Sequence, residues 1–329
     1  MIRAYLYDAN GGDRAIETPK VALPELADHQ LLWIDVVGRE ADEIAWLQKL
    51  FDLRPASAHD LARSPKALTL NNYGTYFHCD VTALAGGDGT GGGAPKVNEA
   101  LRLDLLVGPN WLISVADAEL SFLREFRDQD RGESLIGSLS SASLAAALLD
   151  GHLTKYLSEM EELEAFVDRL DVRMLGRRSV DDHLLAQVVA GRRFVARLRR
   201  MLAPQRSIFY GLSRPDFALI ADANAADHFK SLENRFERTI DTVEHGRELV
   251  QGSFDLFTTR IAETTNVLIR RLTYLSLSLG AVGAVAGIFG MNFETPYTKS
   301  GAVGFWMVIA GLVIVIAAGG IVARLRQWL

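Results

Sequence analysis

The sequence has one cysteine, no excess of basic residues and no apolar run at its beginning. Cys79 alone rules out a framework of intrachain disulfides and is typical of a reducing compartment. A net charge of -6 argues against a nucleic-acid partner, because phosphate binding requires a dense basic surface. The first residues, MIRAYLYDANGG, lack the apolar core of a secretion signal. We therefore expect the bulk of the chain in the cytosol.

The sequence also lacks a recognisable catalytic or metal-ligand pattern. His78, Cys79 and Asp80 fall in a predicted strand, where neighbours point to opposite faces, so they are not expected to bind one metal together. The Asp181–His183 segment opens a helix, where acidic residues favour the N-terminus. The Gly86–Gly93 segment lacks the Gly-Lys-Ser/Thr ending of a phosphate-binding loop and is predicted to be a hairpin loop. We expect neither an enzyme nor a bound cofactor.

Charge is missing from two long segments near the C-terminus. Leu272–Gly290 and Val303–Ala323 contain no charged residue. At a helical rise of about 1.5 Å per residue, each segment is long enough to cross the ~30 Å hydrocarbon core of a bilayer. Because only a short loop separates them, two buried helices of a soluble core are a poor alternative. The sequence therefore predicts two transmembrane helices.

The flanking charges predict the orientation of these helices. Arg270 and Arg271 precede the first apolar segment, and Arg324 and Arg326 follow the second. Positively charged flanks stay in the cytoplasm, so both termini are expected there, with loop 291–302 outside. We expect a multi-pass protein of the bacterial inner membrane, in contact with membrane lipid.

The rest of the chain reads as an α/β part followed by long helices. Short β-branched or aromatic runs bounded by turn residues predict strands at Ile2–Tyr7, Leu31–Val37, Thr75–Ala83, Leu101–Val107 and Trp111–Val115. Helical periodicity then predicts three long helices: Ser141–Leu175, Val180–Leu212 with a break at Pro204, and a third from about residue 226 to Gly290. The third would be ~98 Å long and cannot bury its apolar face alone, which predicts association between subunits.

These predictions define an α+β membrane protein. Its expected parts are a cytosolic α/β domain at 1–140, a helical stalk at 141–271, a pore-lining transmembrane helix at 272–290, an external loop at 291–302, a second transmembrane helix at 303–323 and a basic cytosolic tail at 324–329.

Two stripes of residues on the predicted helices each allow two interpretations. An acidic stripe is either a solvated helix face or a surface that attracts hard cations such as magnesium near a cytosolic mouth; it consists of Glu161, Glu164, Asp168 and Asp171. A glycine stripe favours either tight helix packing or a narrow pore face; it consists of Gly280, Gly283 and Gly287.

One motif links these features to a known family. The triplet Gly290-Met291-Asn292 ends the first predicted transmembrane helix, within the run GIFGMNFE, and the chain ends in Arg326-Gln327-Trp328-Leu329. This combination resembles the CorA family of divalent-cation channels. The segment Arg199–Arg206 resembles the zinc-transporter branch of that family, ZntB.

The resemblance implies a funnel-shaped homopentamer whose first transmembrane helix lines the pore. Gly290, Met291 and Asn292 would form the selectivity filter, where an amide ring holds a cation through its hydration water, as suits magnesium. Glu294 would attract cations in the outer loop. The remaining residues expected to line the pore are an acidic ring at Asp255, a polar ring at Asn266, a constriction at Leu272, and Gly280, Gly283 and Gly287.

The sequence departs from the usual family pattern at several positions. Phe289 stands where magnesium-transporting members have tyrosine, Gly280 where many have a bulky gate residue, and Ser231 where some have a regulatory aspartate. Three functions therefore stay open. They are a passive channel for magnesium with cobalt or nickel, a zinc transporter coupled to protons, and a membrane-anchored scaffold or sensor that conducts no ions.

Overall fold

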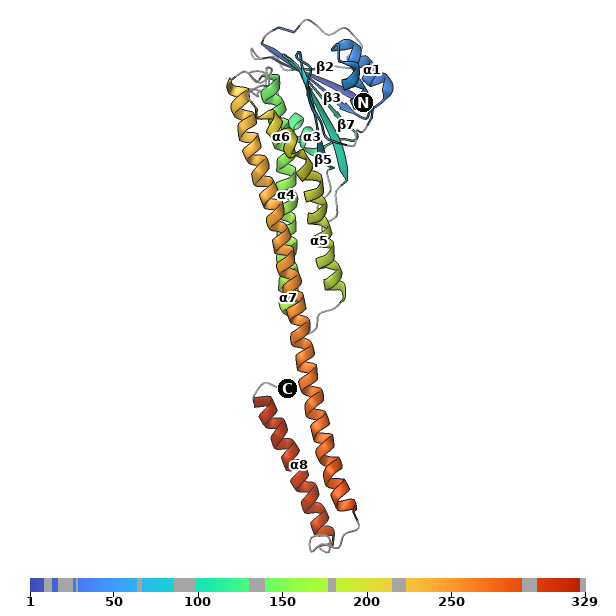
Figure 1. The fold of residues 1–329 in the computed structure, drawn as a ribbon, viewed down its shortest axis with the longest axis vertical. Helices are drawn as coiled ribbons and strands as arrows, with labels where there is room; N and C mark the ends of the chain where they lie inside the picture. The colour runs from blue at the N-terminus through green and yellow to red at the C-terminus, as the bar shows by residue number, and fades with distance from the viewer. Residues whose placement is uncertain are drawn as a thin grey trace. The chain divides into compact units, whose positions relative to one another are not determined.

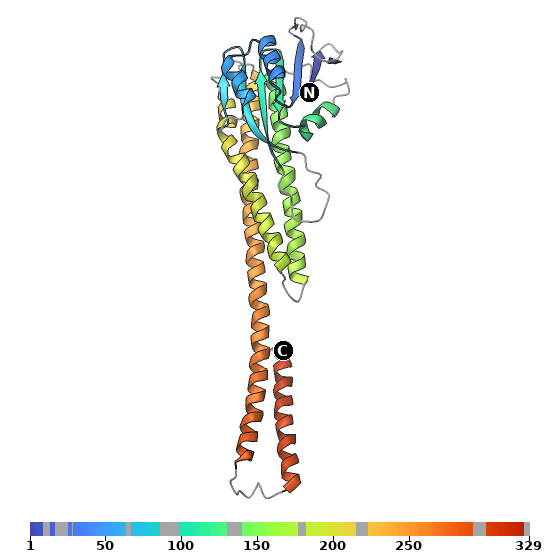
Figure 2. The ribbon, with the colours of Figure 1, turned by 90° about the vertical axis from the view of Figure 1, so that its right-hand side faces the viewer.

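The computed structural model describes residues 1–8, 14–16, 26–27, 29–63, 67–85, 99–129, 140–176, 182–214, 223–291 and 301–325. Contacts divide the chain into two compact units. The first unit comprises Met1–Leu170 and Ala186–Gly252, and the second comprises Asp171–Leu185 and Ser253–Leu329. Figures 1 and 2 show the ribbon in two orientations.

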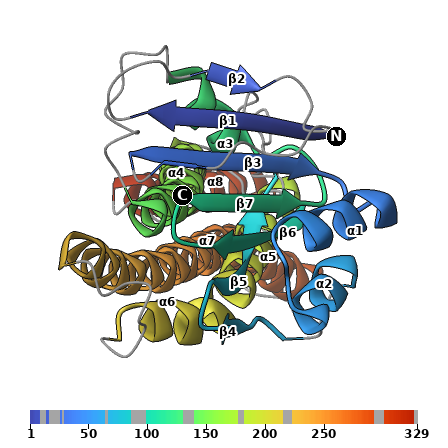
Figure 3. The same ribbon diagram turned by 90° about the horizontal axis from the view of Figure 1, so that it is seen from above.

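A seven-stranded mixed sheet forms the centre of the first unit. Its strand order is β2-β1-β3-β7-β6-β5-β4, and only β3 and β7 run parallel among the described strands (Figure 3). The strands are β1 (Ile2–Asp8), β2 (Arg14–Ile16), β3 (Gln30–Val37), β4 (Leu70–Asn72), β5 (Phe77–Leu84), β6 (Ala100–Val107) and β7 (Trp111–Ala116). The five predicted strands are confirmed. The edge strands β2 and β4 were not predicted, because three residues are too few to show an alternating pattern.

Helices cover both faces of this sheet. The short helices α1 (Ala41–Leu50) and α2 (Pro55–Ala62) lie on one face. The third short helix, α3 (Ser121–Gln129), lies on the other face with the long helices, where its Phe126 packs on Trp33 and its Phe122 on His152. Leu47 of α1 and Leu61 of α2 join one core cluster with Ile34, Leu106 and Ile113 of the sheet. Phe77 of β5 points to the opposite face and contacts Phe229 of a long helix, with ring centroids 6.5 Å apart.

The predicted long helices are also confirmed. They are α4 (Ser141–Gly176), α5 (Asp182–Leu202), a 3-10 turn (Ala203–Gln205), α6 (Arg206–Leu212) and α7 (Ala223–Gly290), which has 68 residues. Pro204 lies in the 3-10 turn, as expected for a residue without a backbone N–H. Gly246 of α7 lets this helix approach α4 closely: a Cβ there would lie 2.1 Å from Met160 Cε.

The second unit contains the C-terminal part of α7 and the last helix, α8 (Gly301–Leu325). The Ser253 hydroxyl donates a hydrogen bond to Asp171 Oδ1 at 2.6 Å, and Arg260 donates to the Leu175 carbonyl at 2.8 Å, which ties the end of α4 to α7. The two helices that contain the predicted membrane spans, α7 and α8, have apolar windows that are not buried within the chain. A surface of this kind is stable in a lipid environment.

Candidate ion pathway

Helix α8 covers only one side of the apolar part of α7. On α7 the half-buried residues are Tyr274, Ser278 and Val285, spaced four and seven residues apart along one face. On α8 the matching residues follow a four-residue spacing: Gly304, Val308, Leu312, Ile316 and Gly320. The seam between the two helices therefore leaves the opposite face of α7 without a partner in this chain, as far as the described residues extend.

The predicted pore residues lie on this uncovered face. An α-helix has about 3.6 residues per turn, so Leu272, Gly283 and Gly290 point roughly opposite to Tyr274, with Gly280 and Gly287 beside them. Leu272 is 64% exposed. A Cβ added at any of the glycines of this face, Gly280, Gly283, Gly287 or Gly290, would meet no described atom within 4 Å. The glycine stripe thus does not serve the packing of α7 on α8.

Asp255 and Asn266 lie earlier on the same helix and are both exposed. They are separated by 11 residues, and Asn266 precedes Gly280 by 14, spacings that return to nearly the same side of an α-helix. In a single chain these side chains form a line along α7, not a cluster. They would meet their equivalents only in an assembly with the uncovered face directed inward.

The predicted filter is described only in part. Gly290 is the last residue of α7, and Met291, 53% exposed, directs its N–H to the Ile288 carbonyl at 3.4 Å. Asn292 and Glu294 lie outside the described residues.

The acidic stripe of α4 is mainly solvent-exposed. Glu161 and Asp168 are exposed and Glu164 is half-buried, whereas Asp171 accepts the hydrogen bond from Ser253. Within the described residues, no three His, Cys, Asp or Glu side chains are arranged to hold a metal ion. The stripe therefore has the geometry of a solvated face in the single chain.

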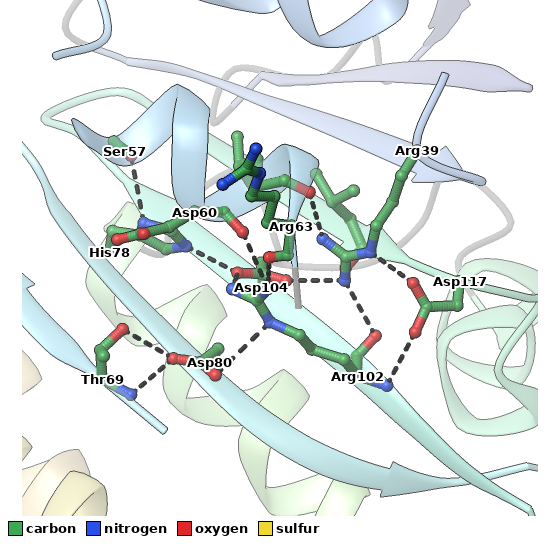
Figure 4. Close-up of polar contacts among 12 residues, drawn as sticks. Arg39, Ser57, Asp60, Arg63, Thr69, His78, Asp80, Arg102, Asp104 and Asp117 are labelled. Carbon is green, nitrogen blue, oxygen red and sulfur yellow. Dashed lines mark hydrogen bonds and ion pairs between the residues drawn. The ribbon is translucent and has the colours of Figure 1, made fainter. Parts of the chain in front are cut away.

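A buried charge cluster on the sheet is the main polar feature that the sequence did not predict (Figure 4). Asp80 of β5 and Asp104 of β6 are direct cross-strand partners, and both are buried. Arg102 forms an ion pair with each of them. Arg39 donates to Asp104 at 2.7 Å, and His78 Nε2 lies 2.8 Å from the other oxygen of Asp104. His78 and Asp80 share a face because they are two residues apart, as expected of a strand.

The electrostatics of this cluster are those of a structural ion network. Burial raises the pKa of Asp80, although hydrogen bonds from Thr69 oppose the shift. Burial by itself lowers the pKa of Arg39, but the carboxylates of Asp104 and Asp117 outweigh it and raise the value. Cys79 points to the opposite face, and burial raises the pKa of its thiol, so it is not a reactive nucleophile.

The fold and the uncovered face define a class of membrane protein: an α/β domain, a very long helix that continues into an apolar segment, and a second apolar helix beside it. Residues 28–326 match the family of CorA-like Mg2+ transporter proteins. The chain belongs to this family, whose members are transport proteins and not enzymes.

Two curated relatives are 23% and 24% identical to this chain over their aligned residues. The divalent cation transporter CmaX of Pseudomonas aeruginosa is 24% identical over 319 residues, which cover 93% of this chain and 90% of the relative. The cobalt/magnesium transport protein CorA of Thermotoga maritima is 23% identical over 186 residues, 56% of this chain and 52% of the relative. The chain thus spans about half the length of that relative.

Solved structures share the fold. The complete CorA magnesium transporter of Methanocaldococcus jannaschii superposes with a TM-score of 0.77 at 16% identity, covering 99% of this chain and 98% of the other. The cytoplasmic domain of ZntB from Vibrio parahaemolyticus superposes with a TM-score of 0.61 at 15% identity, covering 79% of this chain and 98% of that one.

Proposed function

We propose that this protein is a channel subunit that carries divalent metal cations across a membrane as a homo-oligomer, most simply a pentamer. The observation that carries the proposal is the uncovered face of α7, where Leu272, Gly280, Gly283, Gly287 and Gly290 are exposed and small residues predominate. Several copies arranged around an axis would bury this face against one another and enclose a narrow path.

The residues along α7 would act in sequence on the ion. Asp255 would concentrate cations by its charge, and Asn266 would offer amide dipoles. Leu272 would form an apolar constriction. At the other end Gly290, Met291 and Asn292 would hold a hydrated cation through its water shell, with Glu294 raising the local cation concentration.

The arrangement in the membrane follows from the same proposal. Residues 1–140 would form a cytosolic domain and 141–271 a stalk, with spans at 272–290 and 303–323. Loop 291–302 would lie outside, and tail 324–329 would lie in the cytoplasm at the inner membrane of a bacterium. Arg270 and Arg271 precede the first span and Arg324 follows the second, so the two basic groups would lie on the same, cytoplasmic side of the membrane, which supports this orientation.

Magnesium, with cobalt or nickel, is the proposed substrate group. A hard cation that keeps its waters suits a filter of amide and carbonyl oxygens, and the relatives carry magnesium and cobalt in their names. A proton-coupled zinc transporter is the second candidate. It is favoured by the segment Arg199–Arg206, by Ser231 and by the fold shared with the ZntB cytoplasmic domain. A non-conducting scaffold is the third, but it gives no reason for an uncovered glycine face.

Metal uptake into liposomes that contain the purified oligomer tests the proposal. We expect magnesium entry to fall at least tenfold in Asn292→Ala and to persist in Thr298→Ala, a polar change in the same loop. Uptake unaffected by Asn292→Ala would refute the filter assignment. Zinc uptake that exceeds magnesium uptake and depends on a pH gradient would favour the second candidate, and absence of any flux would favour the scaffold.

A further inference from the structure

Among the described residues, one hydrogen bond links the two apolar helices of the second unit. The Tyr274 hydroxyl of α7 donates to the backbone carbonyl of Ile316 in α8 at 2.6 Å. Both residues lie about four turns from the loop that connects the helices. A hydroxyl within an apolar span must find an acceptor, because the surrounding hydrocarbon offers none. The Ile316 carbonyl has a second lone pair, so it can accept this bond in addition to the helical one.

Two glycines of α8 make room for the tyrosine. A Cβ at Gly320 would lie 2.8 Å from the Tyr274 hydroxyl oxygen, closer than side chains tolerate. A Cβ at Gly319 would lie 3.7 Å from the Tyr274 ring, which is an ordinary contact. A side chain at position 320 would therefore displace the hydroxyl from its present position at the carbonyl.

The surroundings of this bond are loosely packed. A groove of about 340 Å³ lies between α7 and α8 beside Tyr274, and Leu277, Ala281, Val315 and Val322 line it. Ser278 also lines the groove, but its side chain appears in none of the hydrogen bonds found among the described residues. In such a seam the position of α7 depends on few contacts, so one hydrogen bond has a large influence on it.

We infer that Tyr274 is a positioning residue of the ion pathway: its bond to Ile316 sets the rotation and height of α7 against α8. The inference rests on the proposed function, since the face it orients is the proposed pore face. Tyr274 lies on the seam, and Leu272, Gly283 and Gly290 lie on the other side of the same rigid helix. A rotation of α7 at Tyr274 would therefore turn those residues relative to the axis of the assembly.

A double-mutant cycle tests whether the bond acts as a unit. Tyr274→Phe removes the hydroxyl and keeps the ring, while Gly320→Ala displaces the hydroxyl and keeps the tyrosine. If both act through the same bond, each lowers the thermal midpoint of the purified oligomer, and the double variant is no worse than the more severe single one. The matched control, Gly319→Ala, is expected to leave the midpoint unchanged. Fully additive losses, or an equal loss in the control, would overturn the inference.

Flux measurements then separate positioning from simple destabilisation. Per reconstituted oligomer, we expect the magnesium concentration for half-maximal uptake to rise at least threefold in Tyr274→Phe and in Gly320→Ala, with no further rise in the double variant. A purely structural role would reduce the number of active oligomers and leave that concentration unchanged, which would contradict the inference. If the wild-type protein shows no flux but the double-mutant cycle is non-additive, the proposed function is refuted. The contact between Tyr274 and Ile316 is then still supported.

Discussion

Individual residues of the first unit show how a buried polar group is kept in place. His152 of α4 is fully buried, and its Nε2–H donates to Gln205 Oε1 at 2.9 Å. Gln205 in turn donates to the Thr82 carbonyl of the sheet at 3.0 Å. This chain of contacts connects α4, the 3-10 turn and β5. Its imidazole is neutral near pH 7, because burial lowers the pKa of His152 to about 4.

The first prediction concerns the pH dependence of stability. The imidazole has a lower pKa in the folded state than its ordinary value of 6.5, so stability is complete above pH 6.5 and falls as the pH drops towards 4. When His152 is protonated in the unfolded chain and neutral in the folded one, the free energy of unfolding is lower by roughly 3 kcal/mol. Thermal midpoints between pH 7 and 4 should therefore fall less steeply in His152→Gln than in wild type. His59→Gln, at an exposed site, should match the wild-type slope; an unchanged slope in His152→Gln would contradict the assignment.

The second prediction concerns the charge cluster of Figure 4. Asp104→Ala leaves Arg39, Arg102 and His78 without their shared carboxylate in a buried site, so we expect a loss of about 3–5 kcal/mol in the free energy of unfolding. Asp117 also pairs with Arg39 but is 39% exposed. Asp117→Ala should therefore cost only about 1 kcal/mol or less. Denaturant titration of both variants measures the difference, and equal losses would show that burial does not decide the cost.

At the scale of elements, helix α7 is the feature that the sequence predicted best. Helical periodicity continues without a proline until Pro296, and the structure has one helix up to Gly290. Gly252 lies exposed within α7, with no described atom within 4 Å of an added Cβ. Nothing in the local packing explains a glycine there, and it is the last residue of the first unit.

This position gives the third prediction. Gly252→Ala should stabilise the protein by roughly 0.5–1 kcal/mol, because alanine loses less backbone entropy in a helix. Gly252→Pro should destabilise it by about 3 kcal/mol or more, since it removes a helical hydrogen bond and its ring clashes with the preceding turn. Thermal unfolding monitored by circular dichroism distinguishes the two. A stabilising proline would mean that α7 is interrupted at this point.

The elements that the sequence did not predict were missed for physical reasons. Strands β2 and β4 are three residues long, too short to show a pattern. The charge cluster joins Arg39 to Asp104 across 65 residues of chain, and such a contact depends on strand order, which local patterns do not contain. The residues expected to line the pore came from the resemblance to a known family and from their register with the motif at the end of α7. The Tyr274 contact could not be predicted in this way, because it required the positions of α7 and α8 relative to each other.

At the scale of the whole molecule, the proposed function requires several copies of the chain. The exposed line from Asp255 to Gly290 spans about 35 residues of one helix, or ~53 Å. Each position occurs once per subunit, so an oligomer would arrange the equivalent side chains in a ring. The weak interaction of one side chain with a cation would then be repeated in every subunit. A ring of carboxylates at Asp255 would create a strongly negative potential in a narrow path.

The last prediction tests that ring through its dependence on salt. Asp255→Asn should reduce uptake of magnesium several-fold at low ionic strength, because the ring would no longer concentrate cations. The deficit should shrink as salt is added, since the Debye length falls from ~30 Å at 0.01 M to ~8 Å at 0.15 M. Glu263→Gln is the matched control: its carboxylate is exposed on α7, lies eight residues from Asp255 and forms an ion pair with Arg260 at 2.9 Å, so its loss should change uptake little. A deficit in Asp255→Asn that persists undiminished at high salt would mean that Asp255 binds the ion directly or supports the helix, and that long-range attraction is not its role.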